Sequence, residues 1–160
     1  MPDVRLTRRY RFSASHRLHS EHLSPEQNRE VYGKCNNPYG HGHDYVMDVT
    51  VRGDVEPATG RLISVDALDH FIHAVVLAKF DRRNLNAEVS EFRTVVPTTE
   101  MLARVIARRL SDAWPVALSG SAGRIEKLRI WETPNNIFDV CLDAPARLES
   151  EGYEISESSG

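Results

Sequence analysis

Two histidines separated by a single glycine, His41 and His43, stand at the start of an alternating apolar segment. Side chains two positions apart in a β-strand leave the same face, so both imidazoles share the face of Tyr45. A third histidine, His16, has the same phase in an earlier alternating segment. If these strands are neighbours, three imidazoles meet at the end of one apolar face. This ligand set is typical of a catalytic zinc site with one open position, and we predict metal binding here.

A lone carboxylate and a loop cysteine are also placed where chemistry could occur. Glu132 is in phase with the apolar residues Leu128 and Ile130 of a predicted strand. A carboxylate at the end of an apolar face costs free energy unless it is paired, so Glu132 is a candidate site residue. The alternative is that the chain simply leaves the sheet there. Cys35 lies in a loop rich in Gly, Asn and Pro, shortly before the paired histidines.

A small sheet and two helices are predicted to position these side chains. Alternation predicts strands over residues 4–16, 43–52, 124–132 and 137–142. Apolar residues at helical spacing predict one helix over residues 66–79 and another from residue 97 to a stop at Trp114-Pro115. Thr98 is the expected cap of the second helix, and the dipole favours Glu100 in its first turn. Capping alone accounts for this stretch without any functional role.

The order of elements is strand, strand, helix, helix, strand, strand, which favours an α+β fold. Two hairpins with two helices between them predict an antiparallel sheet with both helices on one face. The edges of such a small sheet must be protected or paired between subunits, so we expect a homo-oligomer. Residues 1–149 are expected to form a single domain. Residues 150–160 are Ser-rich and acidic, and we expect them to be disordered.

The composition excludes several classes of protein. The chain has 160 residues, of which 41% are hydrophobic, enough for one domain with a core. A net charge of -3 argues against a general nucleic-acid or membrane-surface binder. Two cysteines imply no disulfide framework and fit a reducing compartment. Neither a signal peptide nor a membrane span is evident, so we expect a cytoplasmic protein.

Five sequence motifs together resemble the 6-pyruvoyltetrahydropterin synthase family. They occur in the family's order and span most of residues 4–142. The motifs are FSASH (12–16), GKCNNP (33–38), GHGH (40–43), PTTE (97–100) and WETPNN (131–136). The resemblance implies a tunnelling fold, in which subunits complete a barrel and two trimers stack into a homohexamer.

The resemblance also implies a reaction and roles for single residues. Zn²⁺ would be bound by His16, His41 and His43, and the substrate would be 7,8-dihydroneopterin triphosphate. Cys35, as a thiolate, would abstract a proton, with Asp81 as its partner in proton transfer. Loss of triphosphate and internal redox would leave a pyruvoyl side chain. The pterin ring would be held by Glu132, and the stretch Thr98, Thr99 and Glu100 would line its pocket.

One position departs from the family pattern and keeps alternatives open. Arg82 follows Asp81 where the family has a histidine in a proton relay, and arginine cannot release a proton near neutral pH. Arg82 could instead bind the triphosphate, or His70 or His73 could substitute. The protein could also cleave the pterin side chain or bind a pterin without turnover. Another alternative is 6-carboxytetrahydropterin synthase of queuosine biosynthesis, although its usual spacer between cysteine and histidines is shorter than here.

Overall fold

The sheet of the computed structural model, which describes residues 2–142, has five strands in the order β3-β1-β2-β4-β5. Their bounds are β1 (Val4–His16), β2 (His41–Gly53), β3 (Arg83–Asn84), β4 (Arg124–Trp131) and β5 (Ile137–Cys141). The four expected strands are confirmed, with ends shifted by at most two residues. Residues 150–160, expected to be disordered, lie outside the described residues.

The four expected strands pair antiparallel, as expected, and the sheet gains a short fifth strand that was not expected, β3, which pairs in parallel with β1. The turn before β3 is fastened to β1: the backbone N–H of Arg82 donates to the Ser13 carbonyl at 2.6 Å. The Asp81 carboxylate accepts from the Ser13 N–H at 2.9 Å. These two bonds hold an extended segment beside β1 that is too short to show a strand pattern in the sequence.

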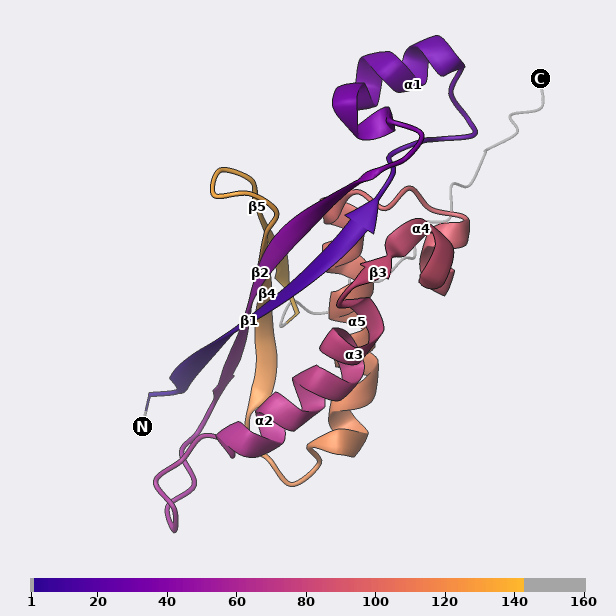
Figure 1. The fold of residues 1–160 in the computed structure, drawn as a ribbon. Helices are drawn as coiled ribbons and strands as arrows, with labels where there is room; N and C mark the ends of the chain where they lie inside the picture. The colour runs from indigo at the N-terminus through magenta and orange to yellow at the C-terminus, as the bar shows by residue number, and fades with distance from the viewer. Residues whose placement is uncertain (1, 143–160) are drawn as a thin grey trace, which may run out of the picture.

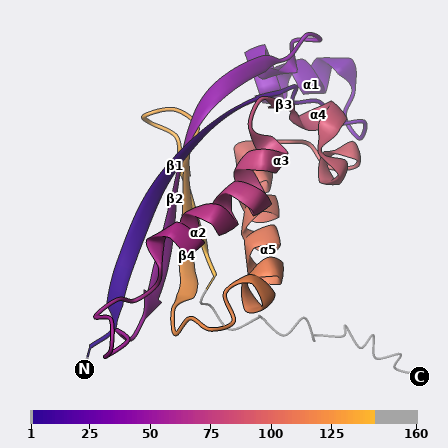
Figure 2. The same cartoon turned by 60° about the horizontal axis from the view of Figure 1, so that its bottom comes forward.

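Two helical segments cover one face of the sheet, as expected (Figures 1 and 2). The first runs from α2 (Val65–Ile72) through a π-helical segment (His73–Leu77) into α3 (Ala78–Phe80). Its buried residues Leu68, Ile72, Val76 and Phe80 recur every fourth position. The second segment is α5 (Thr99–Ala117), whose buried stripe includes Leu102, Ile106 and Leu110.

The predicted stop of the second helix at Trp114-Pro115 is wrong, since α5 continues through Pro115 to Ala117. Proline removes one backbone donor and crowds the preceding turn. Pro115 lies in the last turn of the helix, so few hydrogen bonds depend on it. The Leu118 N–H still donates to the Trp114 carbonyl at 3.0 Å.

The chain between β1 and β2 projects beyond the sheet as α1 (Pro25–Tyr32) and a 3-10 turn (Gly33–Asn36), seen at the top of Figure 1. Ser24 and Gln27 form a reciprocal capping box at the start of α1. Two short segments precede α5, namely α4 (Leu85–Glu88) and a 3-10 turn (Ser90–Arg93). Within residues 2–142, we find no helix long and apolar enough to cross a membrane.

Candidate functional site

The pairing of β1 with β2 brings the three predicted ligands together. In the antiparallel register His16 is opposite His41 and Ala14 is opposite His43, so all three imidazoles share one end and one face. Nε2 of His41 lies 3.0 Å from Nε2 of His16 and 2.9 Å from Nε2 of His43. Three nitrogens converging in this way could hold one metal ion.

The protonation and orientation of these rings favour metal binding. Burial is the main cause that lowers the pKa of His16 and of His41. Neutral imidazoles are therefore favoured, and the neutral form is the one that binds metals. Nδ1 of His16 lies 2.7 Å from the Pro97 carbonyl, which accepts a hydrogen bond from Nδ1–H. Nε2 is then unprotonated and free to coordinate a metal. The histidine set thus fits a divalent ion such as Zn²⁺.

Glu132 faces the histidines instead of leaving the sheet towards solvent. Its Oε1 lies 3.6 Å from Nε2 of His43 and accepts from the Thr99 hydroxyl at 2.6 Å. Its Oε2 accepts from the Asn136 side chain at 3.3 Å. Burial is the largest single influence and opposes ionisation, but the hydrogen bonds from Thr99 and Asn136, together with His43 and His16, hold the pKa of the Glu132 carboxyl below its ordinary value. An ionised carboxylate therefore flanks the imidazole cluster.

Cys35 lies in the 3-10 turn before β2 and is partly buried. Its carbonyl accepts from the Leu18 N–H at 2.9 Å, which ties the turn to the end of β1. Burial, and then the negative charge of Glu132, raise the pKa of the Cys35 thiol. The thiol is therefore protonated in this arrangement, and a nearby positive charge would be needed to favour the thiolate.

The three residues of the PTTE motif with expected pocket roles have different surroundings. Thr99 is buried and bonded to Glu132. Thr98 caps α5, with its hydroxyl accepting from the Met101 N–H at 3.3 Å. Glu100 is exposed on the first turn. The structure thus brings Thr99 to the site and gives Thr98 the capping role that the sequence alone explained.

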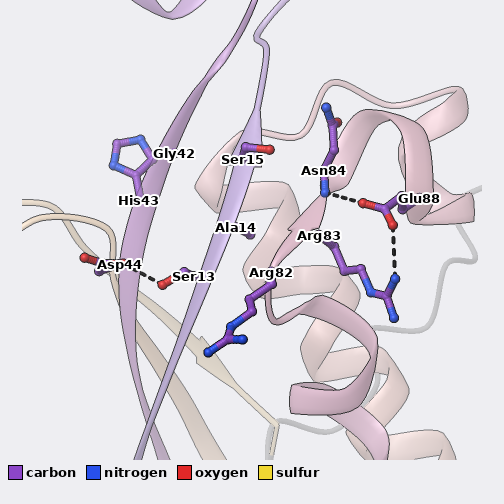
Figure 3. A pocket seen from close by; sticks show the side chains of 10 residues that line it. All are labelled: Ser13, Ala14, Ser15, Gly42, His43, Asp44, Arg82, Arg83, Asn84 and Glu88. Carbon is purple, nitrogen blue, oxygen red and sulfur yellow. Dashed lines mark hydrogen bonds and ion pairs between the residues drawn. The ribbon is translucent and has the colours of Figure 1, made fainter.

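Asp81 and Arg82 lie at the outer edge of β1, where they hold Ser13. These hydrogen bonds tie both residues to the sheet edge, and Arg82 lines the same cavity as His43. Arg82 has a left-handed backbone with φ of 58°. It lines a cavity of about 490 Å³ together with Ser13 and Arg83. Its side chain extends towards β1, whereas that of Arg83 turns to Glu88 (Figure 3).

Two contributors were missed by the sequence reasoning. Asn136 supplies a donor to Glu132 and lies in the turn between β4 and β5. Tyr45 is buried in phase with His43, and its ring centroid is 5.6 Å from that imidazole. The alternation that identified the histidines already placed Tyr45 on their face, so its proximity could have been inferred. The contact between Asn136 and Glu132 depends on the conformation of the tight turn, which the alternation of apolar residues does not predict.

Comparisons with known proteins agree with this geometry. A family model described as 6-pyruvoyl tetrahydropterin synthase matches residues 5–141. The 6-pyruvoyl tetrahydrobiopterin synthase of Poecilia reticulata is 47% identical over 132 residues, covering 82% of this chain and 86% of that protein. The structure of Caenorhabditis elegans 6-pyruvoyl tetrahydropterin synthase superposes with a TM-score of 0.80 at 40% identity, over 88% of this chain and 96% of that one. The 6-carboxy-5,6,7,8-tetrahydropterin synthase of Bacillus subtilis is 30% identical over only 61% of this chain and 64% of its own length.

Proposed function

The chain belongs to the 6-pyruvoyl tetrahydropterin synthase family, and on this basis we propose that it is a zinc-dependent lyase acting on 7,8-dihydroneopterin triphosphate. The product would be 6-pyruvoyltetrahydropterin, formed with loss of triphosphate. The observation that carries this proposal is the cluster of three imidazoles with an ionised carboxylate 3.6 Å from one of them. One end of the site can bind a metal, and the other can accept hydrogen bonds from ring N–H groups.

In this proposal His16, His41 and His43 bind Zn²⁺, which when present supplies a Lewis acid for the substrate's side-chain hydroxyls. The three histidines would hold the ion as neutral ligands, so its positive charge would also favour the thiolate of Cys35. Cys35 then serves as the general base that removes a proton from the substrate side chain. Glu132 holds the pterin through its amino and ring N–H groups, oriented by the hydrogen bond from Thr99.

Asp81 is assigned to proton transfer at the site of a neighbouring subunit. Within its own chain its carboxylate is bound to the Ser13 N–H at the sheet edge. We propose that a homohexamer, a dimer of trimers, brings Asp81 to the Cys35 of the partner subunit, and that the enzyme is cytoplasmic. Thr98 and Glu100 are assigned to the wall of the pterin pocket because they belong to the PTTE motif, which resembles the stretch that lines this pocket in the family.

Arg82 requires a change in the family's mechanism, since a guanidinium keeps its proton. We propose that Arg82 contributes a positive charge for the triphosphate and that water carries away the proton that Cys35 takes from the substrate. The Arg82 side chain, which extends towards β1 and lines a cavity there, supports this assignment, whereas Arg83 beside it is already paired with Glu88 at 3.1 Å.

Product analysis by mass spectrometry tests the function directly. The zinc-loaded protein is incubated with 7,8-dihydroneopterin triphosphate, and we expect 6-pyruvoyltetrahydropterin and triphosphate. The second candidate function, 6-carboxytetrahydropterin synthase, would give acetaldehyde and a 6-carboxy product instead. The similarity to the Bacillus subtilis relative is the observation that favours this second candidate. Tight pterin binding without turnover, and no gain on Arg82→His, would identify a pterin-binding paralogue.

A further inference from the structure

The hydroxyl of Tyr45 has no partner, although the side chain is only 1% exposed. Its Oη is the single buried side-chain nitrogen or oxygen without a hydrogen bond in the part of the chain that the structure describes. Burying a hydroxyl without a partner destabilises a folded protein, and nearly all such groups in native structures are paired. Within residues 2–142 and without a ligand, this hydroxyl therefore lacks the hydrogen bond that a buried hydroxyl normally makes.

Packing does not require this hydroxyl. The Tyr45 ring is stacked on Phe12 across the β1–β2 pair, with centroids 5.0 Å apart and an interplanar angle of 20°. A phenylalanine at this position would keep the same ring contact and would remove the unpaired oxygen. Stability alone thus favours phenylalanine over tyrosine here.

The surroundings of the hydroxyl belong to the candidate site. Tyr45 follows His43 on the same strand face, and its ring centroid lies 5.6 Å from that of the His43 imidazole. Burial raises the pKa of the Tyr45 hydroxyl, whereas the Thr99 hydroxyl lowers it as a neighbouring hydrogen-bonding group, although no hydrogen bond of good geometry joins the two. Thr99 is itself 2% exposed, and its one hydroxyl proton goes to Glu132. The Thr99 oxygen therefore keeps acceptor lone pairs beside an unused donor.

We propose that Tyr45 is a positioning residue, whose hydroxyl donates to the Thr99 oxygen when a ligand occupies the site and so holds Glu132 on the ligand's N–H groups. A donor to the Thr99 oxygen strengthens the donation of Thr99 to Glu132, because linked hydrogen bonds polarise one another. The inference rests on the function proposed above, since it takes the ligand of Glu132 to be a pterin.

The test is Tyr45→Phe in the full-length, zinc-loaded protein, with 7,8-dihydroneopterin as the probe in isothermal titration calorimetry. We expect the dissociation constant of the probe to rise roughly three- to tenfold, the usual effect of losing one hydrogen bond. The zinc content and the melting temperature should stay at or above the wild-type values. A purely structural role would lower the melting temperature instead.

Two further variants make the result specific. Tyr10→Phe removes a phenol hydroxyl that donates to Asp69 at 2.7 Å, away from the histidines. It should lower the melting temperature without changing probe affinity. Thr99→Val weakens binding by itself, and adding Tyr45→Phe to it should have no further effect if Tyr45 acts through Thr99.

A probe affinity within twofold of wild type in Tyr45→Phe would overturn the inference. So would equal losses in Tyr45→Phe and Tyr10→Phe, or a loss of affinity that accompanies loss of zinc. Glu132→Gln separates this failure from a failure of the proposed function. If Glu132→Gln weakens binding and Tyr45→Phe does not, only the role of Tyr45 is wrong; if the wild-type protein binds no probe, both proposals are wrong.

Discussion

At the scale of single residues, the site places imidazoles and the carboxylate of Glu132 together on one apolar face. Burial disfavours charge on both the imidazoles and the carboxylate. His16 and His41 respond by staying neutral, whereas Glu132 stays ionised, helped by hydrogen bonds from Thr99 and Asn136. For His16, burial outweighs the hydrogen bond to the Pro97 carbonyl, which by itself would raise the pKa. Neutral metal ligands and a charged acceptor can thus share one apolar face.

Replacing the loop thiol separates catalysis from metal binding. We expect Cys35→Ala to abolish turnover, because the proposed base is removed, while zinc content stays near one per subunit. Turnover is measured by product formation from the pterin triphosphate, and zinc by atomic absorption. Cys141→Ala is the control, since Cys141 lies in β5 and should leave turnover unchanged. Full activity in Cys35→Ala would remove Cys35 from the role of base.

At the scale of elements, the geometry of the metal site depends on how β2 begins beside the end of β1. Gly40, directly before His41, has a left-handed backbone with φ of 70°. A Cβ at this position would lie 2.7 Å from the carbonyl oxygen of His16. Only glycine allows both the turn and this close approach of the two strands. The spacing of the histidine ligands is thus set partly by a residue that binds nothing.

Gly40→Ala is therefore expected to reduce both stability and metal occupancy. The left-handed conformation costs a residue with a Cβ about 1–2 kcal/mol, and the contact with His16 adds to this. Gly60→Ala is a matched control, because Gly60 also has φ of 70° but a Cβ added there would meet no atom within 4 Å. Thermal unfolding and zinc content are measured for both. Loss of zinc in Gly60→Ala as large as in Gly40→Ala would contradict the argument.

The contact between the 3-10 turn (Ser90–Arg93) and α5 is expected to depend on pH. Two hydrogen bonds of 2.7 Å join Arg109 to Glu91, and Arg109 is the main cause that lowers the pKa of Glu91 to about 2. Since the folded-state pKa is depressed, ionised Glu91 stabilises the fold above pH about 4.5, and this contribution is lost as pH falls towards 2.

We expect Glu91→Gln to lower the free energy of unfolding by about 1 kcal/mol at pH 7, a value reduced by solvent screening. The difference from wild type should vanish near pH 2 in urea unfolding. Asp112→Asn is the comparison, because Asp112 makes only a 3.9 Å ion pair with Arg108 on the exposed face of α5. A difference that persists unchanged at pH 2 would show that the carboxylate charge is not its origin.

At the scale of the whole molecule, the sheet has edges that residues 2–142 leave largely open. Strand β1 has 13 residues, yet β3 pairs with it only at Ala14 and Ser15. On the other side β5 is the last strand of the sheet in the described residues. Open edges favour pairing with further strands, which is consistent with closure into a barrel by several subunits.

Light scattering after gel filtration is expected to give a mass near six times the 18.1 kDa of one chain. Ile137→Lys, at a position on β5 that is 46% exposed, should shift the protein towards smaller species, since charge on an edge strand opposes pairing. Val116→Lys changes a more exposed apolar residue on α5 and should leave the mass unchanged. A monomeric wild-type protein would refute the assembly and, with it, the role of Asp81 at a neighbouring site.

Local periodicity was enough to predict much of this fold from the amino-acid sequence. Four of the five strands, the two helical segments and the common phase of the three histidines follow from spacings of two and four residues. The cost of an apolar-face carboxylate likewise identified Glu132 as a residue needing partners. Such arguments succeed because each concerns one element and the face that it must bury.

Which elements meet could be learned only from the folded chain. Thr99 as the partner of Glu132, the parallel strand β3 and the anchoring of Asp81 to Ser13 all join residues distant in sequence. Long-range contacts of this kind depend on how the faces pack in three dimensions, and no spacing within one element encodes that arrangement.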